Sequence, residues 1–441
     1  MQSGMPLAGL SLAQAPPLSI PASYFLTVPL SLLAAGSILM LTGAVSLSSP
    51  WNPAAVALTH VATLGVLLMG MVGALYQMTP VVAGTPVAAI RLAHAVHFML
   101  LFGLACFVWR LLGGPNIAMT LAGYSLGLAL GGFLLPVGWS LGKSATHNET
   151  VLGMRLAVAS LATIAVMGLV MARGYADVQF PDGRFLWVQL HLTLALLGWV
   201  GGLIVAVSWQ VIPMFYLASP TRKFTQQALL VALLSGLVLP FAAFAIALDN
   251  DAVLSATQWA AVASLPAAAA VWIAHPLLTL HAIARRKRRR GDASLWFWRT
   301  GLMTAVLLFP LLVLAFILAD TRWQILSAWL AIWGWAGMIL HGMLTRIVPF
   351  LVWFHRIAPL LGTVRAPSMR SLLSQRRIRI GYACHLLSLV LGAATIVTQL
   401  DILARLSGAM LAATGLSLGS SLLHVFGKGR GMRLGKVPAG S

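Results

Sequence analysis

Long apolar runs separated by short polar segments occupy this chain from residue 24 almost to its end. A helix needs about 20 apolar residues to cross the hydrocarbon core of a bilayer, and each run reaches about that length. We therefore expect an all-α integral membrane protein. Its twelve predicted spans are 24–47, 54–80, 86–112, 117–142, 150–172, 184–217, 226–248, 256–284, 295–319, 323–354, 378–400 and 402–426.

Composition supports the membrane assignment, because 60% of residues are hydrophobic and only 8% are charged. A net charge of +20 would indicate nucleic acid binding in a soluble protein, but here the basic residues follow the loops. If the N-terminus is cytoplasmic, 20 of the 28 Lys and Arg residues fall on the inside. We therefore expect both termini in the cytoplasm of a bacterium, an inner-membrane location with lipid as the surroundings, and no nucleic acid partner.

A spaced motif recurs three times within the apolar spans. A glycine is followed twelve residues later by Gln or Arg, and three residues further on by proline. The copies are Gly65/Gln77/Pro80, Gly198/Gln210/Pro213 and Gly334/Arg346/Pro349. They are offset by 133 and then 136 residues, which is room for four membrane helices each time. The motif predicts one membrane domain, 1–441, built from three related four-helix units, 24–142, 150–284 and 295–426, with a cytoplasmic tail at 427–441.

Histidines within the spans are the main candidates for chemistry. His60 and His191 lie 20 and 22 residues before the prolines of their motif copies, so they should share an outer layer of the membrane. A second set should form an inner layer; it consists of His341, His94, His97 and His385. His94 and His97 are three residues apart and share a helical face, so both could approach one metal or one could brace the other. The remaining histidines are expected at structural or interfacial positions.

The positions of the acidic residues argue against ion-coupled transport. Glu149 is the only glutamate, and all seven aspartates also fall in or beside predicted loops. Proton pumps and ion-coupled carriers usually place a carboxylate within the membrane. The chemistry inside the bilayer is therefore left mainly to histidine, and we expect no proton pumping.

A neutral imidazole within a membrane needs a hydrogen-bond partner or a ligand, and it is a good axial ligand for haem iron. The chain has no CxxCH motif, so a covalently attached c-type haem is excluded. His60 and His191 could clamp one haem b, whereas the alternative is that each bonds a neighbouring helix. The motif residues Gln77, Gln210 and Arg346 could bond carbonyls released by the prolines. Alternatively, Arg346 could offer its guanidinium to a haem propionate or another anion.

Twelve helices in three units, with His60 on helix 2 and His191 on helix 6, resemble subunit I of the haem-copper oxidase superfamily. The resemblance implies that His60 is a low-spin haem ligand and His191 a metal ligand. Helix 7, residues 226–248, lacks the histidine pair that ligates copper in that family, and the residue four after His191 is Ala195 instead of tyrosine. The chain is more similar to divergent, haem-containing NnrS-type members, which are linked to nitric oxide stress.

We therefore expect a membrane b-type haem protein that transfers electrons or binds or reduces a small diatomic gas, NO or O2. Whether it is an enzyme, a haem-dependent oxidoreductase, is left open. One haem b is expected, or two if the inner histidines are also occupied, while copper is doubtful. A redox partner protein and a homodimer are left open. The alternative is a cofactor-free transporter or assembly factor for a metal or small molecule.

Overall fold

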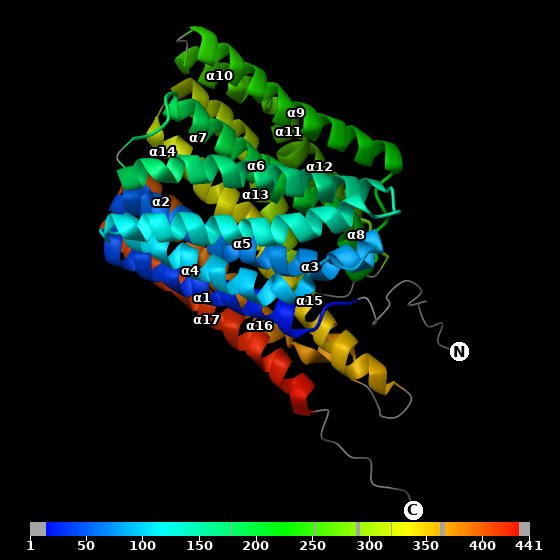
Figure 1. The fold of residues 1–441 in the computed structure, drawn as a ribbon. Helices are drawn as coiled ribbons and strands as arrows, with labels where there is room; N and C mark the ends of the chain where they lie inside the picture. The colour runs from blue at the N-terminus through cyan, green and yellow to red at the C-terminus, as the bar shows by residue number, and fades with distance from the viewer. Residues whose placement is uncertain are drawn as a thin grey trace, which may run out of the picture.

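The computed structural model describes residues 15–177, 179–250, 253–287, 292–318, 320–361 and 367–431. Within these residues all extended regular structure is helical (Figure 1). Twelve helical stretches in this part are long and apolar enough to cross a membrane, which confirms the predicted number of spans. They are Ser19–Leu47, Pro53–Ala83, Ile90–Leu111, Asn116–Gly142, Glu149–Ala176, Arg184–Tyr216, Lys223–Ala242, Ala256–Ala284, Ser294–Leu318, Thr321–Leu360, Gln375–Thr398 and Asp401–Lys428.

Several spans combine α-helix with 3-10 or π segments. The first four spans contain α1 (Ser19–Thr42), η1 (Gly43–Leu47), α2 (Pro53–His60), η2 (Val61–Leu68), α3 (Met69–Ala83), η3 (Ile90–Leu92), α4 (Ala93–Leu111) and α5 (Asn116–Gly142). The next four contain α6 (Glu149–Asp177), α7 (Arg184–Thr193), η4 (Leu194–Gly201), α8 (Gly202–Tyr216), α9 (Lys223–Asn250), α10 (Val253–Ala263), α11 (Leu265–Ala269), η5 (Ala270–Ala274) and α12 (His275–Ala284). The last four contain α13 (Ser294–Leu318), α14 (Thr321–Trp329), η6 (Leu330–Gly337), α15 (Met338–Val352), η7 (Trp353–Ile357), η8 (Ala358–Leu360), α16 (Gln375–Thr398) and α17 (Asp401–Gly431), and η9 (Met369–Leu372) lies in the loop before α16.

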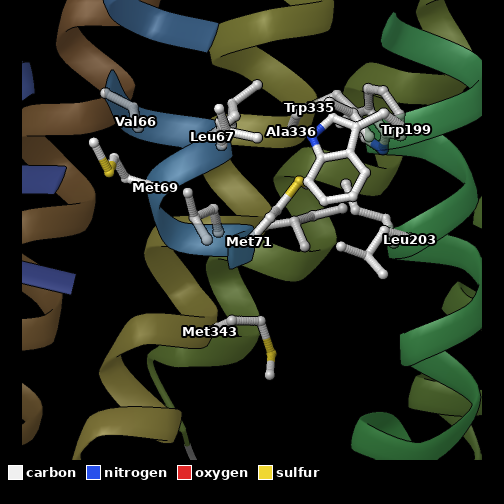
Figure 2. Packing of buried hydrophobic residues seen from close by; sticks show 14 of the residues in the cluster. Val66, Leu67, Met69, Met71, Trp199, Leu203, Trp335, Ala336 and Met343 are labelled. Carbon is white, nitrogen blue, oxygen red and sulfur yellow. The ribbon is translucent and has the colours of Figure 1, made fainter. Parts of the chain in front are cut away.

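The second, sixth and tenth spans form the centre of the bundle. In their most apolar windows 67%, 72% and 78% of the residues are buried, against at most 56% in the other spans. Segment η6 contacts both η2 and η4. Figure 2 shows Leu67 of η2, Trp199 of η4 and Trp335 of η6 in this central packing. The three motif copies therefore lie on the three most buried spans.

The first and last spans pack against each other, and Figure 1 shows α1 next to α17. Helices α1 and α17 run antiparallel and approach so closely that a Cβ at Gly36 would lie 2.5 Å from the carbonyl oxygen of Gly408. Glycine at both positions removes the side chains that would separate the backbones. We call the end of the bundle where α1 begins and α17 ends the terminal end, and the opposite end the distal end.

The three central spans share one local geometry. Each contains an eight-residue π segment, and η2, η4 and η6 begin at residues 61, 194 and 330. These starts are separated by the same 133 and 136 residues as the sequence motif. In every case the motif glycine is the fifth residue of the π segment, and a 15-residue α-helix follows. Because π segments are rare and are frequently found at functional sites, this recurrence directs attention to the residues around them.

The motif glycines also have equivalent neighbours. A Cβ at Gly198 would lie 2.5 Å from the Ser160 Oγ on α6, the span that precedes it, and 3.3 Å from Leu237 on α9, the span that follows it. The corresponding neighbours of the other two glycines are Ser31 and Leu104 for Gly65, and Thr304 and Leu389 for Gly334. Glycine therefore allows a small polar side chain of one helix to press against the π segment of the next.

Candidate functional site

The distal histidines lie at the start of two of the central π segments. His60 is the last residue of α2 and immediately precedes η2, while His191 lies in α7 three residues before η4. The helices that carry them meet at the distal end, where the Trp51 and Phe185 rings are 5.2 Å apart in an edge-on contact. The structure thus places each of the two histidines just before the π segment of its own central span.

His60 is braced in a way that leaves one ring nitrogen available. Its Nδ1 lies 2.8 Å from the carbonyl oxygen of Val56, one turn earlier in α2. A carbonyl can only accept, so Nδ1 carries the proton and Nε2 of the neutral ring carries the lone pair. The Phe107 ring of α4 lies 4.8 Å from the imidazole. A metal-ligating histidine commonly donates its other N–H to a carbonyl in this manner.

His191 has an unsatisfied nitrogen. Its Nδ1 is buried and has no hydrogen-bond partner among the residues that the structure describes. The ring faces α6, where a Cβ at Gly168 would lie only 3.3 Å from the Cε1 of His191. A buried polar atom without a partner is costly, so this nitrogen favours a ligand. The two distal histidines therefore fit the requirements of haem ligation.

The terminal half of the bundle holds a second histidine pair, His341 and His385, both almost completely buried. The Nδ1 atoms of the two rings are 3.1 Å apart. Nε2 of His385 lies 3.0 Å from the carbonyl oxygen of Trp333 in η6, and the rings of His385 and Trp333 stack at 3.7 Å. The structure therefore brings together two of the four histidines that the sequence assigns to the inner layer.

The other two members of that predicted layer face α1 instead. His97 lies 2.7 Å from the Thr27 hydroxyl and edge-on to the Tyr24 ring, 4.8 Å away. His94 is exposed and has a longer contact, 3.4 Å, with Ser19. Both imidazoles thus bond a neighbouring helix, as the structural alternative for membrane histidines predicts.

Arg346 has a carboxylate partner that the sequence analysis did not identify. Its guanidinium forms a buried ion pair with Asp292, and its Nε donates to the Ser294 hydroxyl over 2.9 Å. Arg370 lies 3.3 Å from the same carboxylate. Asp292 also accepts from the Ser294 backbone N–H at the start of α13, a typical helix-capping bond. In the sequence, Asp-Ala-Ser before an apolar run indicates the start of a helix. It does not indicate that the aspartate is buried against Arg346.

The motif residues equivalent to Arg346 have other surroundings. Gln210 is exposed, and its Nε2 lies 3.4 Å from the Thr150 hydroxyl. Gln77 is buried, and its Oε1 has no partner in the described part of the chain. Arginine at the third copy therefore differs from glutamine by having a nearby acid that neutralises it.

A further buried histidine was assigned no role by the sequence analysis. His275 begins α12 directly after the π segment η5 and is 1% exposed. Its Nε2 is 2.8 Å from the Ser208 hydroxyl, which itself lies 2.7 Å from the carbonyl oxygen of Val205. Because the hydroxyl can donate only one proton, donation to the carbonyl leaves it as an acceptor from His275. The structure therefore turns this imidazole into the bundle, where it bonds a neighbouring span.

The donor set determines which kind of metal group these histidines suit. Among the residues described, no group of three or more His, Cys, Asp or Glu side chains is arranged to hold a metal ion. A structural or catalytic zinc ion normally takes three or four protein ligands. Haem iron takes four ligands from its macrocycle and only one or two from the protein. A pair such as His60 and His191 therefore suits haem better than a bare ion.

Comparison with known proteins adds no family assignment, because no protein-family model matches the chain and no curated protein matches its sequence. Function must therefore be inferred from the residues themselves.

Proposed function

We propose that this chain is a membrane b-type haem protein in which His60 and His191 ligate the haem iron near the distal end. The observation that carries the proposal is that two central spans each hold a histidine before a π segment, one braced by a carbonyl and the other with a buried, unsatisfied nitrogen. The carbonyl of Val56 fixes the His60 tautomer with Nε2 toward a ligand. Gly168 leaves the space that the His191 ring occupies.

Bound haem would supply a one-electron couple or a site for a diatomic gas. Two histidine ligands favour electron transfer, whereas ligation by only one leaves a coordination position for NO or O2. His341 is the candidate ligand for a second haem, since its bond to His385 leaves one ring nitrogen with a free lone pair. Copper has less support, because no set of three ligands lies together among the described residues.

Proton pumping is not part of the proposal. Among the acids that the structure describes, Asp292 is the buried one, and it pairs with two arginines. A carboxylate that is engaged by two guanidiniums is occupied by its ion pairs and does not resemble the open carboxylate of a proton path.

The proposed topology has both termini in the cytoplasm of a bacterium, so that the distal histidines lie toward the outer face of the inner membrane. The basic loops at the terminal end support this orientation. The proposed architecture has three related units, 24–142, 150–284 and 295–426. The shared spacing and geometry of η2, η4 and η6 support it. A distant kinship with haem-copper oxidase subunit I or NnrS-type proteins is the corresponding family hypothesis.

The first experiment is an absorption spectrum of the detergent-purified protein, oxidised and dithionite-reduced, with a pyridine haemochrome assay for haem per chain. Wild-type protein made under haem-replete conditions should show a Soret band and a sharp reduced alpha band. His60→Ala and His191→Ala should each lose the same haem. His147→Ala, which alters an exposed loop histidine, is the matched control and should keep it.

Full haem retention in both histidine variants would overturn the ligand assignment. A wild-type protein without haem would instead favour the cofactor-free alternative, in which the three units enclose a substrate path. Stabilisation of that protein by an added metal ion would then be the measurement to pursue.

A further inference from the structure

Arginines at the distal end fall into two classes. Arg322 pairs with Asp320 at 3.0 Å, and Arg405 pairs with Asp401 at 2.6 Å. Within the described residues, Arg110 and Arg184 have no carboxylate at ion-pair distance. Both are nevertheless half-buried, whereas the remaining distal arginine, Arg173, is exposed. A partly buried cation without an anion is unfavourable, so the partial burial of these two guanidiniums suggests that they bind an anionic group.

Arg110 lies beside the His60 environment. It is one turn after Phe107 on α4, and residues three apart share a helical face. The Phe107 ring contacts His60, so Arg110 lies about 5 Å further toward the distal end on the same side of α4. Its Nε is buried and has no hydrogen-bond partner in the described part of the chain. The guanidinium therefore has unused donor capacity next to the distal histidines.

Arg184 begins α7, the helix that carries His191. It lies seven residues before His191 on α7, which places both on one face, about 10 Å apart along the axis. Its guanidinium is stacked between two rings, 4.7 Å from the centre of Trp51 and 3.9 Å from that of Phe180. Stacking of this kind holds the planar group in one orientation while its edge N–H groups stay free to donate.

We propose that Arg110 and Arg184 bind the two propionate carboxylates of the haem, which fixes its edge toward the distal end. The inference rests on the proposed function. Haem b carries two anionic groups on one edge, and beyond the two histidines on that side lie two guanidiniums that pair with no acid among the described residues. Arginine suits this task because its N–H groups match carboxylate geometry. Arg346, which the sequence offered for this role, already has Asp292 and lies at the opposite end.

The test uses full-length protein carrying Arg110→Leu or Arg184→Leu, with Arg322→Leu as the control at an acid-paired distal arginine. Haem transfer to excess apomyoglobin and the haem midpoint potential are measured. Loss of a charged hydrogen bond should accelerate transfer about tenfold in each test variant. The midpoint potential should shift downward, because a nearby cation favours the reduced, less positive iron. The control should match wild type in both measurements.

Lysine variants keep the test decisive if leucine impairs folding. Arg110→Lys and Arg184→Lys retain the positive charge but lose the paired N–H donors of the guanidinium. The haem midpoint potential of these variants should stay near that of wild type, while haem transfer to apomyoglobin should still be faster than from wild type. Wild-type transfer rates and potentials in both leucine variants, with the haem still dependent on His60 and His191, would overturn this inference alone. Absence of haem from the wild-type protein would overturn it together with the proposed function.

Discussion

The Nδ1 atoms of His341 and His385 lie 3.1 Å apart, and the second ring is held by the Trp333 carbonyl. That carbonyl can only accept, so His385 carries its proton on Nε2 and accepts at Nδ1. His341 must then donate from Nδ1, which leaves its Nε2 as a lone pair. The structure thus fixes the tautomers of two buried imidazoles through one backbone group of a π segment.

Replacement of His385 by leucine should destabilise the protein, because it leaves the His341 N–H and the Trp333 carbonyl unpaired while keeping the volume similar. The expected loss is about 3 kcal/mol, from two buried polar groups. Thermal unfolding in detergent measures it. His94→Leu, at an exposed histidine with a 3.4 Å contact, should change stability by less than about 0.5 kcal/mol. Equal effects of the two substitutions would contradict the assigned network.

The Asp292–Arg346 ion pair should be strongly coupled. Asp292→Asn leaves two arginines without their acid and should cost about 3 kcal/mol or more. Arg346→Gln restores the residue found in the other motif copies and should cost less, because Arg370 still faces the carboxylate. A double-mutant cycle over these two positions measures the coupling. Additive effects would show that the pair contributes little.

The motif glycines should not tolerate side chains. Gly198→Ala would place a methyl group 2.5 Å from the Ser160 hydroxyl and should cost about 1 to 3 kcal/mol through overpacking. Adding Ser160→Gly should recover much of the loss, since it removes the opposing side chain. The control is Gly131→Ala on α5, where a Cβ meets no atom within 4 Å. An unfolding temperature that drops equally in both alanine variants would argue against the close packing.

Haem occupancy should depend on where the His191 ring lies as well as on the presence of the imidazole. Gly168→Val adds bulk where a Cβ alone would already approach Cε1 to 3.3 Å, so the ring must move. We expect haem occupancy to fall although both histidines remain. Pyridine haemochrome measurement reports this, and Gly123→Val, at an open position on α5, should leave occupancy unchanged. Wild-type occupancy in Gly168→Val would mean that the ring does not depend on this space.

The sequence by itself determined the helices and their number. In lipid every backbone group must be bonded within the chain, so apolar runs of about 20 residues leave helix as the available structure. The spacing of glycine, Gln or Arg, and proline also marked the second, sixth and tenth spans as related, while the structure showed that these spans are the most buried. The depths of His60 and His191 followed from the fixed rise of a helix, and so did their assignment to one layer.

Only the tertiary structure decided which polar side chains meet. His97 and His385 have similar predicted depths, yet one bonds Thr27 of α1 and the other bonds His341. Asp292 looks like an ordinary loop acid in the sequence, yet it is buried against Arg346. Depth along a helix is set locally, whereas the direction a side chain faces depends on how each helix rotates to pack against all its neighbours. That rotation is fixed by contacts between residues far apart in the chain, which hydropathy and spacing do not encode.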